Sequence, residues 1–451
     1  MRRATLLLLL FLLLGVASAS AEGLPLAGHW EGAVSRLGAV QIIQIDFREE
    51  SGRFTGTVDV PALGLLEAPL EEVRYEPPSL RFKFLYGEPA LTVDAETQEI
   101  TGLIESWEPD VRVHLKRMPP PPPSFRGQEV TFRKGGVTLA GTLLQPLTPG
   151  PHPTIVLLHG SAQPGRMEPF YRSSGILFAR QGIAALIYDR RGEGQSTGDA
   201  EKATFDDLAA DAAAAVASLR TRGDVDPRRV GLVGFSQGGW LAPLAATKTD
   251  GVAFLILING PAVSVEEQEI QRVRETLLAE GAAEEDVARA VSYTRKVFNT
   301  AYRDGSWEEL VAATERAKSA PWAGKVVQLV TSPADLEGWR RQRFDPAPVL
   351  RRTKVPVLAL FGEWDTVVPP AGNADLLRSL LAEAGNQDVT IKVFPRAGHG
   401  LEQPGDLRQG NWRWPSGYWF WGRRAPGYQE TVVGWILERT APRKPAVGSV
   451  P

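Results

Sequence analysis

The chain has 451 residues, enough for roughly two or three domains with a large core. Its 43% hydrophobic and 23% charged residues are ordinary for a folded soluble protein, and the net charge of −3 argues against a nucleic-acid or polyanion partner. The sequence contains no cysteine, which excludes disulfides, thiolate metal sites and cysteine nucleophiles.

The first 21 residues have the composition of an export signal. Arg2 and Arg3 precede an apolar run, Leu6–Leu14, and small residues follow it. The run is short for a membrane span, so we expect a secretory signal peptide over residues 1–21, cleaved after Ala19 or Ala21. The protein is then periplasmic or secreted. An uncleaved N-terminal membrane anchor is the alternative.

Residues 22–117 carry short stretches in which apolar and polar residues alternate, separated by turn residues. The expected strands are Val40–Phe47, Arg53–Val60, Leu80–Leu85, Ala90–Val93, Ile100–Ile104 and Val111–Leu115. Such spacing predicts a small antiparallel β-barrel or sandwich. His29 and His114 lie in this segment without other chemistry-bearing residues nearby in sequence, and we expect them to be structural.

Residues 118–124 contain five consecutive prolines, which form a stiff spacer and mark a domain boundary. Residues 125–451 then form a second domain. A hairpin is expected at Glu129–Phe132 and Thr138–Leu144. The expected buried strands are Thr154–Leu158, Ala184–Tyr188, Arg229–Val233, Phe254–Ile258, Val355–Phe361 and Thr390–Val393, and the expected helices are Gly175–Gln181, Leu208–Arg220, Trp240–Thr247 and Ala374–Ala384. This alternation predicts an α/β domain with a mostly parallel sheet and helices on both faces.

One insertion, at about residues 262–345, interrupts the alternation. Its central part, Glu266–Trp339, is charged, rich in Ala, Glu and Arg, and helical in pattern. We interpret it as a helical lid over the carboxyl edge of the sheet. A helical excursion directed away from the site is the alternative.

The stretch Gly234-Phe235-Ser236-Gln237-Gly238 matches G-x-S-x-G and lies between an expected strand and an expected helix. A serine on such a sharp turn needs small neighbours, because its backbone packs closely against adjacent elements. The helix N-terminus behind it supplies free N–H groups where an oxyanion can form. Ser236 is therefore the candidate nucleophile.

Together with this motif, four further segments that each follow an expected strand resemble the α/β-hydrolase superfamily. They are His159-Gly160, the run from Asp189 to Ser196, Gly362-Glu363-Trp364-Asp365 and Ala397-Gly398-His399-Gly400. The layout over about residues 125–440 is similar to esterases of the dienelactone-hydrolase or prolyl-oligopeptidase-like branch. The opening Gly28-His29-Trp30-Glu31-Gly32 resembles the small β-domain that precedes the hydrolase domain of some exported bacterial esterases.

The base that activates Ser236 should be a histidine. His152 lies at the start of a strand, the wrong end of a parallel sheet, and the resemblance places His159 in the oxyanion-hole loop, close to substrate. His399 remains, in agreement with the family pattern.

The acid that orients His399 is expected to be Asp365, which gives the chain order Ser–Asp–His. Glu363, two residues earlier, is the alternative. Asp189 also ends a strand, but the resemblance makes it structural.

Two backbone donors are expected to hold the oxyanion. One is the N–H of Gln237, the residue after the nucleophile, and the other is that of Ser161, with Ala162 as the alternative. The loop reads His-Gly-Ser-Ala, which departs from the lipase branch that carries three glycines there.

An aromatic segment follows His399 and includes Trp412, Trp414 and Trp419. These side chains are candidates for a substrate wall. Packing against the N-terminal domain and contact with a membrane surface are the alternatives.

These features predict an exported serine hydrolase that cleaves small-molecule carboxylic esters through an acyl-enzyme. A peptidase, thioesterase or acyltransferase using the same triad is the alternative, and a catalytically silent binding protein is the alternative from another class. We expect no cofactor, no metal, no nucleic-acid partner and no obligate membrane partner, because no cluster of ligand-type residues or basic run calls for one.

Overall fold

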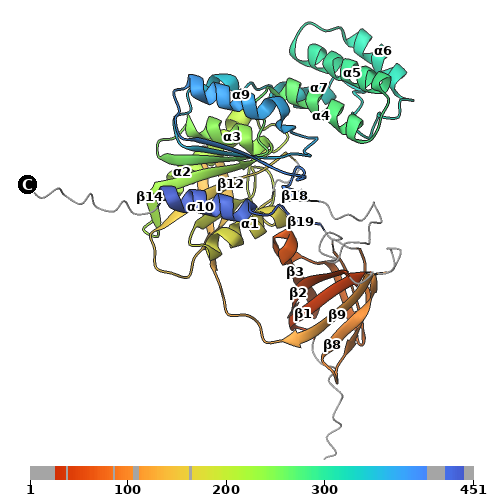
Figure 1. Ribbon diagram of the computed structural model, residues 1–451, viewed down its shortest axis with the longest axis vertical. Coiled ribbons are helices and arrows are strands. Elements are labelled where there is room, and N and C mark those ends of the chain that lie inside the picture. The colour runs from red at the N-terminus through yellow and green to blue at the C-terminus, as the bar shows by residue number, and fades with distance from the viewer. Residues whose placement is uncertain are drawn as a thin grey trace, which may run out of the picture.

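The computed structural model describes residues 26–36, 39–84, 87–104, 111–161, 165–403 and 422–440. An N-terminal antiparallel sheet precedes a larger mixed sheet that carries helices on both faces, and a group of helices projects from the larger sheet (Figure 1). This is the architecture that the sequence predicts. Within the described ranges, none of the helices combines the length and apolar character needed to cross a bilayer.

The N-terminal sheet is an up-and-down meander of nine strands. They are β1 (Gly28–Arg36), β2 (Ala39–Glu50), β3 (Arg53–Val60), β4 (Leu65–Pro69), β5 (Glu71–Glu76), β6 (Ser79–Lys83), β7 (Ala90–Asp94), β8 (Glu99–Ile104) and β9 (Val111–Met118). A short 3-10 helix, η1 (Pro61–Leu63), joins β3 to β4. The order β4-β3-β2-β1-β9-β8-β7-β6-β5 leaves β4 and β5 at the edges, and β3 also contacts β5. The sheet therefore curls into a nearly closed barrel around an apolar core.

The second sheet has eight strands in the order β10-β11-β13-β12-β14-β15-β16-β17. Their bounds are β10 (Arg126–Lys134), β11 (Val137–Gln145), β12 (His152–Leu158), β13 (Ala184–Tyr188), β14 (Val225–Phe235), β15 (Val252–Ile258), β16 (Val357–Gly362) and β17 (Val389–Phe394). Strand β11 is antiparallel to both neighbours, and the six strands from β13 to β17 are parallel. Because both faces are covered, the parallel strands are nearly continuous apolar runs.

Helices cover the two faces of this sheet. On one face lie α1 (Pro169–Arg180) and α10 (Tyr428–Thr440), and on the other lie α2 (Phe205–Leu219), α3 (Gln237–Ala246), α8 (Ala347–Leu350) and α9 (Pro370–Glu383). Helix α1 begins six residues before the expected start at Gly175, because the Glu168 carboxylate accepts the N–H of Phe170 and Pro169 fits the first helical turn. Helix α10 was not predicted.

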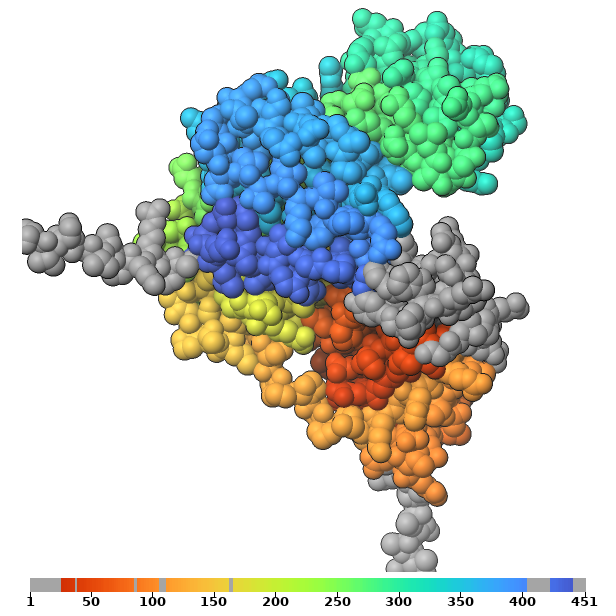
Figure 2. Space-filling model, in the orientation of Figure 1, coloured from red at the N-terminus to blue at the C-terminus, as the bar shows by residue number. Residues whose placement is uncertain are grey.

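The insertion between β15 and β16 consists of α4 (Val265–Ala279), α5 (Glu284–Tyr302), α6 (Trp307–Ala317) and α7 (Asp335–Arg341). These helices enclose a hydrophobic cluster of their own, and Val265 of α4 and Phe298 of α5 also belong to the cluster on one face of the sheet. In the space-filling view the insertion (green) stands away from the N-terminal sheet (red to orange), and both border the remainder of the second domain (Figure 2). Helix α4 is nearest the sheet, where Gln268 donates to the carbonyl of Val367 at 2.7 Å.

The N-terminal sheet docks on α1. Leu66 of β4 is buried in the hydrophobic cluster that α1 and α10 form with the larger sheet. The Ser173 hydroxyl accepts the N–H of Leu66 at 2.8 Å and donates to its carbonyl at 3.1 Å. Beside it Arg172 and Glu67 form an ion pair. The docked strand is thus packed and hydrogen-bonded like part of the second domain.

The strand order reverses at β12, which has β13 on one side and β14 on the other. In open parallel sheets, ligands bind outside the carboxyl ends of the strands at such a reversal. The loops that leave β12, β13, β14, β16 and β17 lie at this edge, and they carry the residues singled out from the sequence.

Candidate active site

Ser236 occupies a strained turn between β14 and α3. Its φ and ψ are 53° and −117°, a left-handed conformation that is costly for a residue with a side chain. Its N–H donates to the carbonyl of Ile258 at 2.9 Å, and its carbonyl accepts from Gly239 at 2.8 Å. The turn thus lifts the hydroxyl-bearing residue above the end of the strand, at the N-terminus of a helix.

The two glycines that flank Ser236 in the motif are required by close approach of the backbone. A Cβ on Gly234 would lie 2.0 Å from the carbonyl oxygen of Gly238. A Cβ on Gly238 would lie 2.6 Å from the carbonyl oxygen of Leu158. Neither obstacle is a movable side chain, so the G-x-S-x-G pattern follows from the geometry of the turn.

His399 and Asp365 form a hydrogen-bonded pair. The Nδ1–H of His399 donates to Oδ2 of Asp365 at 2.8 Å, because an ionised carboxylate only accepts. The Asp365 side chain is completely buried, and its other oxygen accepts the N–H groups of Val367 and Val368 at 2.8 and 2.9 Å. The carboxylate is therefore fixed in position, and it holds the imidazole with Nε2 free to accept a proton.

The residue before Ser236 contacts this pair. The ring of Phe235, the residue before the serine, is 5.2 Å from the imidazole of His399. The structure thus brings the three expected triad residues to the carboxyl ends of β14, β16 and β17.

Glu363, the alternative acid, is exposed and accepts the N–H of Arg396 at 2.7 Å. The imidazole of His399 is bonded to Asp365 instead.

Asn259, which the sequence analysis did not single out, connects the loops of the triad. It is fully buried directly after β15 and has a φ of 47°. Its Nδ2 donates to the carbonyl of His399 at 2.5 Å, and its Oδ1 accepts the N–H of Gly362 at 2.9 Å. A polar residue at the carboxyl end of a predicted buried strand was the signal that could have identified it.

A second support holds the loop after His399. The guanidinium of Arg424 donates to the carbonyl of Gly400 at 2.5 Å and packs over the rings of Phe170 and Tyr428. It also lies against Gly64 of the N-terminal sheet. Arg424 therefore contacts both the loop that carries His399 and the N-terminal domain.

The loop after β12 approaches the nucleophile closely. A Cβ added to Gly160 would lie 3.5 Å from Cβ of Ser236. The N–H of Gly160 donates to the Tyr171 hydroxyl at 2.6 Å, so it is already occupied. Ser161, the expected second oxyanion donor, follows at an exposed turn beside the serine, and the alternative Ala162 lies outside the described residues.

His159 is completely buried, and its ring packs edge-on against Tyr171 and Tyr188, with 4.9 Å between ring centroids in each pair. Burial lowers its pKa to about 3, with the charge of Arg190 adding to the effect and a hydrogen bond to the Tyr188 carbonyl opposing it. The imidazole of His159 therefore packs inside the protein beneath the loop after β12, whereas the sequence analysis expected it to contact substrate. His152 lies at the far end of β12, as expected.

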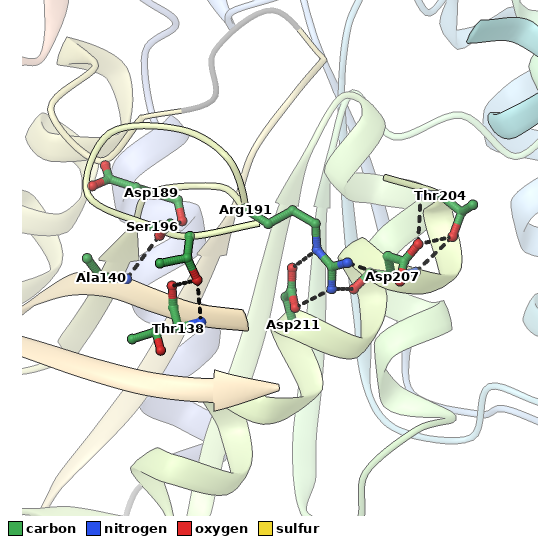
Figure 3. A network of polar contacts seen from close by, with 9 residues as sticks. Thr138, Ala140, Asp189, Arg191, Ser196, Thr204, Asp207 and Asp211 are labelled. Atoms are coloured by element: carbon green, nitrogen blue, oxygen red, sulfur yellow. Dashed lines mark hydrogen bonds and ion pairs between the residues drawn. The ribbon is translucent and has the colours of Figure 1, made fainter. Parts of the chain in front are cut away.

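The Asp189 carboxylate organises the loop after β13. It accepts the N–H groups of Arg166 and Gln195 at 2.9 and 3.0 Å, and it makes no contact with His399. The Ser196 hydroxyl, within the same loop, bridges the carbonyl of Asp189 and the N–H of Ala140 (Figure 3). Asp189 is therefore a structural residue, as the resemblance implied.

The expected substrate-wall residues Trp412, Trp414 and Trp419 lie outside the described residues. In the part of the chain that is described, no group of three or more acidic or histidine side chains has the arrangement of a metal site.

Comparison with known families decides where this chain belongs. The family model described as "Serine aminopeptidase, S33", of the α/β-hydrolase superfamily, matches residues 149–403, which is more than half of the chain. The chain belongs to this family. The matched region runs from before β12 to just after the histidine loop, and it contains Ser236, Asp365 and His399. Membership of the α/β-hydrolase superfamily, expected from the motifs, is confirmed.

The individual relatives of this hydrolase that we compared have low sequence identity to it. It is 26% identical over 286 residues to Esterase EstD of Thermotoga maritima, and the match spans 62% of this chain but only 60% of EstD. Among solved structures, the Pyrococcus furiosus esterase Pf2001 is 16% identical with a TM-score of 0.43, covering 70% of this chain and 92% of its own. Hypothetical protein PA2218 of Pseudomonas aeruginosa is 18% identical with a TM-score of 0.42, covering 71% and 95%.

Proposed function

We propose that this α/β hydrolase cleaves carboxylic esters through an acyl-enzyme on Ser236. The observation that carries the proposal is the joint placement of a strained serine after β14 and the His399–Asp365 pair, bonded at 2.8 Å, at the same edge of the sheet. A hydroxyl is a weak nucleophile until a neighbouring base removes its proton, and an imidazole held by a buried carboxylate is suited to this task.

In the proposed reaction, Oγ of Ser236 attacks the ester carbonyl while Nε2 of His399 takes its proton. Asp365 keeps the imidazole in the correct tautomer and stabilises the cation that forms. The N–H groups of Gln237 and Ser161 hold the oxyanion, and removal of one such donor costs about 10²–10³-fold in kcat. His399 then protonates the departing alcohol, and water activated by the same imidazole releases the acid.

Two comparisons bear on the substrate class. The relative EstD is called an esterase, whereas the family description names an aminopeptidase. An aminopeptidase needs a free carboxylate for the substrate amino group. At this edge the described candidates are engaged: Asp365 holds His399, Asp189 accepts two N–H groups, and Glu363 accepts the N–H of Arg396. This favours esters, and the peptidase is the second candidate.

The test is a substrate panel with a nucleophile variant. Wild type, Ser236→Ala and the control Ser218→Ala, whose serine lies on α2 away from the edge, are assayed with p-nitrophenyl esters of increasing chain length, a thioester and amino-acid p-nitroanilides. We expect ester hydrolysis by wild type and Ser218→Ala, and a loss of about 10³-fold or more in Ser236→Ala.

Hydrolysis that persists in Ser236→Ala refutes the proposed nucleophile. Faster cleavage of the anilides than of any ester assigns the chain to the peptidases, and preference for the thioester assigns it to thioesterases or acyltransferases. Inactivity on the whole panel favours the binding-protein alternative.

We further propose that the protein is exported, on the basis of the charged, apolar and small-residue segments within residues 1–21. Expression of the full chain followed by cell fractionation and N-terminal sequencing is the test. A mature protein that begins at residue 20 or 22 in the periplasm or medium supports cleavage. An intact N-terminus in the membrane fraction supports the anchor instead.

A further inference from the structure

Three arginines surround the loop that leaves β13, and two of them have carboxylate partners. Arg191 pairs with Asp211 at 2.7 Å and with Asp207 at 3.0 Å (Figure 3). Arg166 pairs with Glu129 at 3.0 Å. Arg190 differs, because no ion pair within the described part of the chain includes it, and its hydrogen bond there goes to a neutral acceptor, the side-chain oxygen of Gln237.

Arg190 lies beside the proposed reaction centre. Gln237 follows Ser236 directly and supplies the expected first oxyanion donor, and neighbouring Cα atoms are about 3.8 Å apart. Gln237 is buried, and its side-chain oxygen accepts a hydrogen bond from Arg190. This bond holds the guanidinium at the edge of the sheet where the strand order reverses. Arg190 keeps part of its surface exposed and is therefore accessible to a bound molecule.

No carboxylate of the described residues forms an ion pair with Arg190. The groups around it are Tyr171, Tyr188, His159, Gln237 and Glu193; burial lowers its pKa, and the Glu193 carboxylate attracts its charge without reaching ion-pair distance. His159 is neutral above about pH 3, so it is not a cation that competes for an anion. Arginine nevertheless stays protonated in proteins, and a partly desolvated guanidinium is stabilised by an anion that forms two charge-assisted hydrogen bonds with it.

We propose that Arg190 binds a carboxylate carried by the ester substrate, so that the preferred substrates are anionic esters. This inference rests on the proposed ester hydrolysis and names the substrate class. The planar guanidinium matches a carboxylate in a bidentate fork, which a lysine or an amide does not reproduce. Since Arg190 bonds to the side chain of Gln237, the residue after Ser236, an anion bound to it lies on the same side of the site as the proposed oxyanion donor.

The experiment compares isosteric pairs of esters that differ in one charge. On the acyl side, the phenyl monoester of glutaric acid is compared with phenyl butyrate and phenyl pentanoate. On the alcohol side, 4-carboxyphenyl acetate is compared with 4-methylphenyl acetate. Each is assayed with wild type, Arg190→Gln, Arg190→Lys and the control Arg220→Gln. Among the described residues Arg220 likewise donates to neutral acceptors, the carbonyls of Pro227 and Asp250, but it lies at the end of α2, away from the site.

We expect wild type to prefer the charged member of one pair in kcat/KM, and the pair concerned identifies the side of the ester that Arg190 contacts. Arg190→Gln should lower kcat/KM for that charged ester by about tenfold or more, the usual size for loss of a hydrogen bond to a charged group, and should change the neutral ester by less than about threefold. Arg190→Lys should restore part of the preference, and Arg220→Gln should behave as wild type.

Free glutarate provides a readout that needs no turnover of a charged ester. It should inhibit hydrolysis of phenyl acetate competitively in wild type, more weakly in Arg190→Gln, and less at high salt. Equal losses on charged and neutral esters, or a wild-type preference for neutral esters, overturn the proposal. If Ser236→Ala still hydrolyses the neutral esters, the proposed function fails instead, which distinguishes the two.

Discussion

The side-chain amide of Asn259 donates a hydrogen bond to the backbone carbonyl of His399 at 2.5 Å, while its oxygen accepts the N–H of Gly362 at 2.9 Å. One buried side chain therefore ties the histidine loop to the end of β16, three residues before Asp365. The distance between imidazole and carboxylate depends on both loops, so Asn259 is a positioning residue for the pair.

Replacement of Asn259 should accordingly impair turnover more than binding. In Asn259→Asp the acceptor remains but the donor to His399 is lost, and we expect kcat to fall by about 10–100-fold with little change in KM, because small displacements of catalytic groups are costly. The measurement is steady-state kinetics on a p-nitrophenyl ester across pH. Asn386→Ala is the matched control, since Asn386 is also buried and bonds two backbone carbonyls, but at the opposite end of β16. A control that loses as much kcat as Asn259→Asp would contradict the positioning role.

The glycines of the serine turn should tolerate no side chain. In Gly234→Ala the new Cβ would meet the carbonyl oxygen of Gly238 at 2.0 Å, and we expect the free energy of unfolding to fall by about 3 kcal/mol together with the ester hydrolysis rate. Chemical denaturation with a parallel assay is the measurement. Gly338→Ala, in α7, has open space around the added Cβ and should be neutral or stabilising by about 0.5–1 kcal/mol. Wild-type stability in Gly234→Ala would mean that the turn is looser than described.

Buried His159 should make the protein sensitive to acid. Its pKa is lowered from 6.5 to about 3 in the folded state, so between these values the unfolded chain binds a proton that the native protein does not. Stability therefore rises with pH through this window, and it is lost as the pH falls below about 6.5, by up to about 1.4 kcal/mol per pH unit from this group. Urea unfolding at pH 7 and pH 5 measures the slope.

A variant without the titrating group, His159→Gln, should be less stable at pH 7 but should show a smaller loss between pH 7 and pH 5. The control is His152→Gln, at the other end of β12. An unchanged slope in His159→Gln would exclude this histidine as the source of the acid sensitivity.

The docked N-terminal sheet should be needed for the stability of the hydrolase domain. Leu66→Ala removes a side chain that is 4% exposed within the cluster around α1, and we expect a loss of about 2–5 kcal/mol and a lower midpoint for the transition of the hydrolase domain in calorimetry. Leu147→Ala, at a side chain that is 54% exposed, should change little. Separate transitions with only the first one shifted would contradict the docking.

Much of the hydrolase fold could be predicted from the sequence, because parallel strands that are buried on both faces consist of continuous apolar runs. The strand Ala184–Tyr188 coincides with β13, and Arg53–Val60 coincides with β3. The start of β14 was predicted less accurately: β14 begins at Val225 and not at Arg229. Val225 pairs with His152 ahead of a register irregularity, and the polar residues between Val225 and Val230 have no partner in β12, so no apolar run marks this start.

Strands β1, β4 and β5 escaped prediction for a related reason. Strand β5 is mostly exposed, and its alternation is limited to two half-buried residues, Val73 and Tyr75. Strand β4 takes part in the second domain's core through Leu66, a contact between distant segments that no local pattern encodes. Helix α10 has a weakly segregated apolar face, and its buried side chains are selected by the sheet beneath it.

The same distinction applies to the site. Ser236, Asp365 and His399 could be predicted because each follows an expected strand closely. Ser236 and His399 are also flanked by glycines, and all three residue types are those that a catalytic triad requires. Asn259 and Arg190 have roles that depend on what lies opposite them in space. Asn259 faces the carbonyl of His399, and Arg190 faces the amide oxygen of Gln237 and has no ion-pair partner among the described residues. Sequence spacing carries no information on either relationship.

The four-helix insertion has its own apolar centre, and it meets the rest of the second domain through Val265 of α4, Phe298 of α5 and a few hydrogen bonds of α4. Because most of its apolar residues pack against one another, this insertion can be exchanged for helices of a different shape while the strands of the sheet stay intact. An exchange of the insertion would then change the range of substrates without altering the residues at the carboxyl ends of the strands.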